Sequence, residues 1–203
     1  PDSWGHGGDA GNPTSPHYMT DPNDIAQGVH EADRAWHCGA HGNLIGIGIE
    51  QSGKAAMTRD EWNSTAGQQE RKLTAALILD ICKRHPNIKP IHLTDAQLAA
   101  VYAAAIANPG VAQIGGYVGH DAITRVLGDT THTDPGTGYP WDLLAADIAA
   151  LTTTPTPSEE DDMLAPDTLQ QLSNLIDARI KAALTDPKVI AVHVLDIAKT
   201  PSS

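Results

Sequence analysis

The sequence predicts an α/β fold in which a mixed central β-sheet is flanked by helices, with a further helix appended at the C-terminus. Short segments with the two-residue alternation of strands occur along the chain, most clearly at residues 44–50. Segments with helix-capping signals and apolar residues three or four apart stand between and after them. Because strand-like and helical segments intermix, helices are expected to cover a single sheet.

The chain begins with a segment that is expected to form a loop, since residues 1–16 are rich in Gly, Asp, Pro and Ser. A short strand is predicted at residues 17–20. Its antiparallel partner is predicted at residues 25–29, after a turn at residues 21–24.

Residues 44–50 are predicted to form a buried strand, because isoleucines alternate with glycines up to Glu50. One face of this strand is expected to pack on the core. The other face is bare backbone, which another group can approach closely. Glu50 is expected to lie at the end of that open face.

The remaining elements of the main domain follow from caps, apolar spacing and breaking residues. In order, the sequence predicts a helix over residues 58–84 with a stripe of Leu73, Leu77 and Ile81, a helix over 94–107, a strand over 113–118 and a helix over 141–151. Residues 152–162 are Thr/Pro-rich and then acidic, and are expected to be a linker. Residues 163–203 contain an amphipathic helix and a tail that includes an unassigned apolar stretch, 189–197.

The overall charge argues against some partners. The formal net charge is -12, so neither a nucleic acid nor an anionic membrane surface is an expected partner. No run of about 18 apolar residues occurs, so membrane insertion is not expected. No signal peptide is visible, although the chain starts at Pro1 rather than Met. Two free thiols are expected for Cys38 and Cys82, with a disulfide as the alternative.

Three motifs contain candidate chemical groups: His120 within Gly-His-Asp, residues 131–136 with the sequence Thr-His-Thr-Asp-Pro-Gly, and Ala-Trp-His at residues 35–37. His120 and Asp134 have 13 residues between them, and a loop of that length can bring an imidazole and a carboxylate onto one zinc ion. Taken alone this pair is a weak signal, because Asp134 before Pro-Gly is also a common turn residue.

Taken together and in order, these motifs resemble the type-2 N-acetylmuramoyl-L-alanine amidase family, which is related to peptidoglycan recognition proteins. The resemblance covers roughly residues 14–150 and is greatest to amidase domains of actinobacteriophage endolysins. It implies that residues 1–151 are an amidase catalytic domain that lacks its first strand. The implied activity is hydrolysis of the amide bond between N-acetylmuramic acid and L-alanine in peptidoglycan.

The resemblance implies a zinc cofactor, Zn2+, which the family holds with two His and one Asp or Cys. His120 matches the second His and Asp134 matches the carboxylate ligand. Three protein ligands leave a fourth position for water, as in hydrolytic zinc sites. The first His of the family ends an N-terminal strand, and it is expected upstream of Pro1. Substitution by His6 is the less favoured alternative.

The resemblance also implies two catalytic residues. Glu50 would accept a proton from the attacking water and pass it to the leaving amine. The alternative is an exposed carboxylate at the end of a strand. His132 stands where many relatives carry Lys and would donate to the oxyanion, which makes activity more dependent on pH. The alternative is an exposed loop residue.

Three residues are candidates for substrate binding: His37, Trp36 and Asn43. His37 is expected to line the substrate groove, and a core His bonded to backbone is an equal alternative. Trp36 is more readily a core residue than a platform for ligand. Asn43 is expected to fix the loop that enters the strand at residues 44–50. His17 matches the second strand of the family and is not expected to bind metal.

Competing functions remain at this stage. Members of the superfamily that lack a metal ligand bind peptidoglycan without cutting it, and a zinc peptidase that acts on stem peptides is a third possibility. If the protein is a phage endolysin, it is expected in the host cytoplasm and then, after holin-dependent release, at the cell wall; otherwise it is expected to be secreted. Residues 166–184 are expected to self-associate, to act as a spacer to a wall-binding module, or to fold back on the domain.

Overall fold

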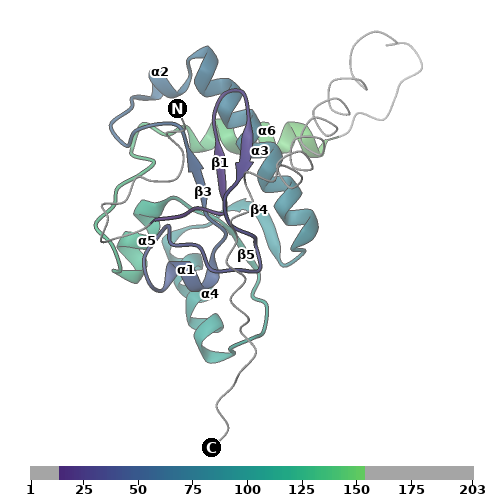
Figure 1. The fold of residues 1–203 in the computed structure, drawn as a ribbon, viewed down its shortest axis with the longest axis vertical. Helices are drawn as coiled ribbons and strands as arrows, with labels where there is room; N and C mark the ends of the chain where they lie inside the picture. Colours follow the sequence, from purple (N-terminus) through teal and green to yellow (C-terminus); the bar gives the residue numbers. More distant parts are fainter. Residues whose placement is uncertain (1–13, 154–203) are drawn as a thin grey trace, which may run out of the picture.

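The structure is a computed structural model that describes residues 14–153 of the chain (Figure 1). Strands and helices intermix in these residues, which confirms the predicted α/β class. In chain order the elements are β1 (Tyr18–Thr20), β2 (Ile25–Gln27), α1 (Gly42–Ile45), β3 (Ile49–Gln51), α2 (Arg59–Trp62), α3 (Thr65–Arg84), β4 (Ile88–His92), α4 (Asp95–Ala107), β5 (Gly115–Tyr117), α5 (His120–Leu127) and α6 (Trp141–Thr152).

The N-terminal hairpin forms as predicted. β1 and β2 pair antiparallel, with Tyr18 opposite Gln27. The turn between them is closed by the Asp21 carboxylate, which accepts hydrogen bonds from two backbone N–H groups at 2.6 and 2.8 Å. β3 pairs with the other edge of β1 in parallel, so that Glu50 lies opposite Met19. The order of this three-stranded mixed sheet is β2-β1-β3.

A second sheet contains β4 and β5, which run parallel. β5 was predicted, but β4 was not, because the segment Ile88–His92 contains Pro90 and lacks a clear alternation. Within residues 14–153 no strand joins β3 to β5, so the expected single sheet is divided into two.

The predicted strand over residues 44–50 is wrong at its start. Residues 42–45 form the single helical turn α1, and the strand begins only at Ile49. Leu44, expected at the start of the strand, lies in this turn and is 51% exposed. The alternation of isoleucine and glycine therefore begins several residues before the part of this segment that pairs with β1.

The predicted helix over residues 58–84 is divided into α2 and α3. Thr58 forms the capping box that the sequence predicts, and Ser64 then caps a second helix through a hydrogen bond to the Gly67 N–H. Gly67 lies directly against the backbone of Trp62, where a Cβ would meet the Trp62 carbonyl oxygen at 2.2 Å. This close approach lets Trp62 turn its indole into the core at the break.

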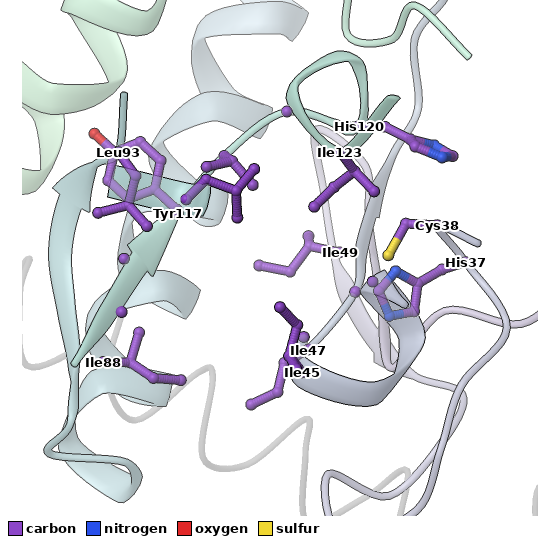
Figure 2. A pocket seen from close by; sticks show the side chains of 18 of the residues that line it. His37, Cys38, Ile45, Ile47, Ile49, Ile88, Leu93, Tyr117, His120 and Ile123 are labelled. Atoms are coloured by element: carbon purple, nitrogen blue, oxygen red, sulfur yellow. The ribbon is translucent and has the colours of Figure 1, made fainter. Parts of the chain in front are cut away.

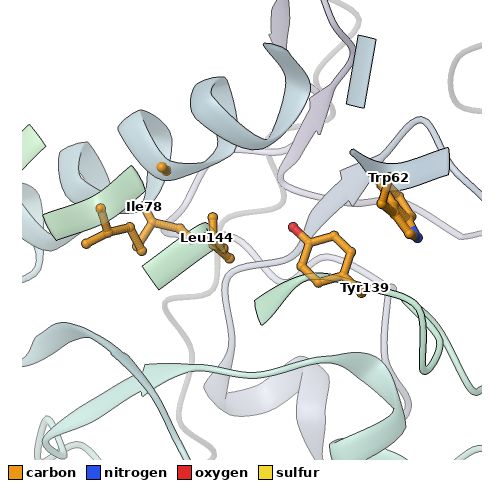
Figure 3. Close-up of a cluster of buried hydrophobic side chains, with 6 residues drawn as sticks. Trp62, Ile78, Tyr139 and Leu144 are labelled. Atoms are coloured by element: carbon orange, nitrogen blue, oxygen red, sulfur yellow. The ribbon is translucent and has the colours of Figure 1, made fainter. Parts of the chain in front are cut away.

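The core lies on both sides of α3. One buried cluster unites α2, α3 and α6 with the loop that precedes α6, and its labelled members are Trp62, Ile78, Tyr139 and Leu144 (Figure 3). A second cluster joins α3 to the hairpin through Leu77, Ile81, Tyr18 and Ile25. The predicted stripe of α3 is thus confirmed, with Leu73 partly buried at its edge.

Charged groups hold the hairpin to the C-terminal end of α3. The carboxylate of Glu31 accepts hydrogen bonds from Tyr18 and Arg84 at 2.7 Å each and contacts the ring of His85 at 2.7 Å. Burial alone would raise the pKa of Glu31, but these hydrogen bonds outweigh it and lower the pKa to about 2.

The other predicted helices form with small differences. α4 begins with the predicted capping box at Thr94, and α6 covers the predicted residues 141–151. α5 was not predicted. Both cysteines are free, as expected. No helix in the described part of the chain is long and apolar enough to cross a membrane. The linker at 152–162 lies almost wholly, and the amphipathic helix at 166–184 entirely, outside the described residues.

Candidate functional site

His120 and Asp134 are brought together at the N-terminal end of α5. His120 is the first residue of this helix, directly after β5 and the two residues that follow it. The loop after α5 returns to the same place, because the Asp121 N–H donates to the Asp134 carbonyl oxygen at 2.9 Å. The Nδ1 atom of His120 then lies 3.2 Å from Oδ2 of Asp134.

This pair has the separation of two zinc ligands. Zinc bonds to nitrogen and oxygen are about 2.0–2.2 Å, so neighbouring ligands of a tetrahedral ion lie about 3.3 Å apart. The side chain of His120 is 14% exposed, whereas that of Asp134 is 46% exposed. The hydrogen bond and the charge of His120 lower the pKa of Asp134, against a smaller opposing effect of burial. The pair therefore fits zinc and leaves an open side for water or substrate.

His132 joins this pair, since ligand atoms of His120, His132 and Asp134 all lie within 4.8 Å of one another. Its Nδ1 atom is 3.4 Å from Oδ1 of Asp134, and its side chain is 63% exposed. However, the rings of His120 and His132 are stacked, with centroids 4.5 Å apart and planes at 9°. Imidazole lone pairs lie in the ring plane, so two stacked rings do not aim at one ion. In this arrangement the ring of His132 is not aimed at the space between His120 and Asp134.

Glu50 belongs to the same group of charges. It lies in the middle of β3 and its side chain is accessible to solvent. Partial desolvation, and then the negative charge of Asp134, raise the pKa of Glu50, while His120 and His132 act in the opposite direction. A carboxyl group with a raised pKa is suited to accept and return a proton.

His37 lies below these residues and covers the backbone of Gly48. A Cβ on Gly48 would come within 2.4 Å of the imidazole ring, so the bare face expected at this glycine is filled by the protein itself. Burial, and then the nearby His17, lower the pKa of His37 to about 4. Its buried Nε2 has no hydrogen-bond partner within the described residues. His37 also lines a cavity, so it combines both roles considered from the sequence.

Asn43 fixes the loop that contains His37. Its side-chain oxygen accepts hydrogen bonds from the backbone N–H groups of His37 and Cys38, at 2.9 and 2.8 Å. This is the bracing role predicted for it, although it holds the loop before α1 rather than the start of β3. Trp36 is 54% exposed, so the expectation of a core position is wrong.

His17 has a structural role that sequence reasoning did not assign. Its side chain is 2% exposed, Nδ1 accepts a hydrogen bond from Gly48 N–H at 2.9 Å, and Nε2 lies 3.1 Å from the Asp33 carbonyl oxygen. Both ring nitrogens are therefore occupied, and burial, the largest influence, lowers the pKa of His17. His17 thus connects the start of β1 to Gly48, the residue over which His37 packs.

A cavity of about 730 Å³ separates the two sheets and reaches His120 (Figure 2). Ile47 and Ile49 on the β3 side face Ile88 and Tyr117 on the side of β4 and β5. α3 and α4 also contribute to its lining. α4 is an apolar helix, yet Leu98 is its only buried residue, and Ile106 near its end is 55% exposed. Within residues 14–153, no helix or strand fills this apolar cavity between β3 and β5.

Comparison with known proteins agrees with the motifs. The family model described as N-acetylmuramoyl-L-alanine amidase matches residues 3–137. A search of curated proteins gave no match. Among solved structures, a similar one is the Staphylococcus aureus hydrolase AmiA in complex with its ligand, with 21% sequence identity and a TM-score of 0.46. The alignment covers 66% of this chain and 57% of the AmiA chain, so this chain matches little more than half the length of that relative.

Proposed function

The chain belongs to the N-acetylmuramoyl-L-alanine amidase family, and from this premise we propose that it is a zinc-dependent hydrolase of the bond between N-acetylmuramic acid and L-alanine in peptidoglycan. The proposal rests above all on one observation. His120 Nδ1 and Asp134 Oδ2 lie 3.2 Å apart, the separation expected for two zinc ligands, and Glu50 interacts electrostatically with both residues.

The residues divide the reaction among them. His120 and Asp134 would hold the metal, which would supply polarisation of the amide carbonyl and a more acidic water molecule. Glu50 takes a proton from the attacking water and returns it to the L-alanine nitrogen as the C–N bond breaks. His132, beside the metal position, donates a hydrogen bond to the oxygen on which negative charge develops. The products are the lactyl carboxylate of the sugar and the free amine of the peptide.

A third protein ligand is proposed to come from outside residues 14–153. By the sequence resemblance, this ligand would be a His at the end of a further strand. The cavity between β3 and β5 supports such a strand, because both flanking strands have one edge without a strand partner among the described residues. Since apolar groups line the cavity on several sides, the inserted segment is expected to be a mostly apolar strand, as in buried parallel sheets.

A second candidate function is binding of peptidoglycan without cleavage. One observation favours it: because the ring of His132 is stacked on that of His120, only His120 and Asp134 among the described residues are oriented to bind one zinc ion. Two ligands are fewer than the three that catalytic zinc sites use. This candidate predicts retention on cell walls with no new chain ends.

The two functions are separated by digestion of purified cell wall with the full-length protein. If the protein is an amidase, digestion should release new amino groups on L-alanine. A zinc chelator should stop this release, and added zinc should restore it. New amino groups on other residues would instead indicate a peptidase. Binding to the walls with no new amino groups, before and after zinc addition, would contradict the amidase and support the binding module.

The biological setting is proposed from the sequence resemblance. A phage endolysin would act on the host wall after release from the cytoplasm through a holin-dependent step, and a bacterial amidase would be secreted. The stripe predicted at residues 166–184 supports self-association of the full chain. Light scattering of the full-length protein and of a variant that ends at residue 162 tests this. The same number of chains per particle in both proteins would contradict it.

A further inference from the structure

Two threonines connect His120 to the loop that holds His132 and Asp134. Oγ1 of Thr130 lies 3.3 Å from Nε2 of His120 and 2.5 Å from Oγ1 of Thr124. The Thr124 hydroxyl also donates to the carbonyl oxygen of His132 at 2.8 Å, and the His132 N–H donates to Thr130 Oγ1 at 3.4 Å. The four contacts form one continuous chain.

The protons in this chain can be placed in only one way that satisfies every contact. The carbonyl oxygen of His132 can only accept, so the single hydroxyl proton of Thr124 is used there. Thr124 must then accept from Thr130, which uses the single hydroxyl proton of Thr130. Thr130 is left with two acceptor positions. One receives the His132 N–H, and the other must receive a proton from Nε2 of His120.

This assignment decides which nitrogen of His120 is able to bind a metal. With Nε2 donating to Thr130, Nδ1 is the nitrogen left for a metal. Without metal it faces Asp134 at 3.2 Å and can share a proton with that carboxylate, and metal binding releases this proton. We infer that Thr124 and Thr130 are positioning residues that fix the Nε2–H form of His120 and so present Nδ1 to the metal. This inference deepens the proposed function and depends on it for the identity of the metal.

The fold holds Thr130 in the orientation that this role needs. A Cβ on Gly39 would lie 2.7 Å from the Thr130 methyl carbon, so the methyl group packs closely against that glycine. The neighbouring Asp129 carboxylate accepts a hydrogen bond from the His41 N–H at 2.5 Å, which ties the loop to the start of α1. With its methyl group directed at Gly39, Thr130 turns its hydroxyl toward His120.

Thr124 is placed by the helix itself. It follows His120 by four residues in α5, and residues four apart lie on the same side of a helix. The helix therefore supplies the ligand and the second hydroxyl from one face, and the loop supplies the hydroxyl between them. Groups that bond the second nitrogen of a metal-binding His fix its tautomer and its ring orientation, and their loss commonly weakens metal affinity about 10–100-fold.

The direct test measures the His120 tautomer in metal-free full-length protein, by long-range proton–nitrogen NMR at pH 8. The expected result is a proton on Nε2, whether or not Nδ1 shares a second proton with Asp134. Thr124→Val removes the acceptor of the Thr130 proton, which can then be donated to Nε2 of His120. The population of His120 without a proton on Nε2 should therefore rise in Thr124→Val, a change that a purely structural role would not produce.

The second measurement is zinc affinity, determined by competition with a chelating dye. Thr130→Val retains the shape of the side chain and removes the hydroxyl, and it should weaken binding about 10–100-fold. Thr130→Ser keeps the hydroxyl and should restore most of the affinity. Thr131→Val is the matched control, since Thr131 is an exposed neighbour, and its affinity should equal that of the unmodified protein.

Two outcomes would overturn the inference. One is an Nε2 of His120 that carries no proton in the unmodified protein, which is decisive even where a variant fails to fold. The other is a folded Thr130→Val protein with unchanged tautomer and unchanged zinc affinity. Failure of the proposed function is distinguishable, because the unmodified protein would then bind no zinc while the tautomer of metal-free His120 could still be measured.

Discussion

The imidazole rings of His120 and His132 lie face to face, with centroids 4.5 Å apart and only 9° between their planes. This stacking is the reason that we propose different roles for the two residues, although both lie beside Asp134. His120 is held by α5 and is mostly buried, whereas His132 is 63% exposed and lies over the outer face of the site. Their roles can be separated by mutation.

Replacing His132 by Ala should reduce turnover about 100–1000-fold, the usual cost of losing one donor to an oxyanion. Zinc content should be unchanged, because the ring is not aimed at the metal. Turnover and bound zinc are both measured on the same preparation. His132→Lys is the matched variant, and it should recover activity because an ammonium group also donates. Loss of zinc in His132→Ala would show that His132 is a ligand.

Replacing Glu50 by Gln should reduce turnover about 100–10,000-fold with zinc content intact, since the amide cannot accept the proton of the water. The pKa of Glu50 is raised, so the carboxylate forms at a higher pH than in an ordinary glutamate. Activity of the unmodified protein should therefore decline on acidification sooner than an ordinary carboxyl group would predict. Glu61→Gln is the control, because Glu61 is exposed at the start of α2. Full activity of Glu50→Gln would remove Glu50 from the mechanism.

Gly48→Ala should displace His37, because the added methyl group would lie 2.4–2.7 Å from three ring atoms. Overpacking of this kind costs about 1–3 kcal/mol, which should be seen in the free energy of unfolding in urea. Gly115→Ala is the matched control at the start of β5, where the methyl group would meet no atom within 4 Å. Equal stability of the two variants would contradict the packing of His37 over Gly48.

Acid should weaken the contact between the hairpin and α3. The pKa of Glu31 is about 2 in the folded protein, below its ordinary value of 4.5. A lowered pKa contributes stability that is present above pH 4.5 and is lost as the pH falls toward 2, by an amount on the order of 2–3 kcal/mol. The free energy of unfolding, measured from pH 4.5 down to pH 2, should fall more steeply for the unmodified protein than for Glu31→Gln. Asp60→Asn, at an exposed residue of α2, should behave as the unmodified protein does.

Local signals in the sequence predicted much of this fold. The capping boxes at Thr58 and Thr94 begin helices where expected, because a cap is decided by residues three positions apart. β4 was missed because Pro90 lies within it, and the partner that makes it a strand, β5, is distant in the sequence. The break at Ser64 was missed because the packing of Trp62, a tertiary contact, ends α2.

The site was predictable in composition and less so in geometry. His120, Asp134, His132 and Glu50 converge as the ordered motifs indicated. The stacking of His132, the hydroxyl chain through Thr124 and the buried bonds of His17 had no signal in the sequence. They depend on how the loop after α5 closes on the start of α1, and on how His17, just before β1, packs against Gly48. Trp36 was wrongly expected in the core, since residue type alone does not show that its loop leaves the side chain at the surface.

The gap between β3 and β5 has a consequence for handling the protein. A strand edge with unused backbone donors and acceptors is a template on which another molecule can add a strand. Here two such edges flank one apolar opening, and Leu44 and Ile106 are exposed among the residues that line it. Protein in which this opening stays empty is therefore expected to aggregate or to exchange strands between molecules. The segment that fills the opening would then also keep the protein soluble.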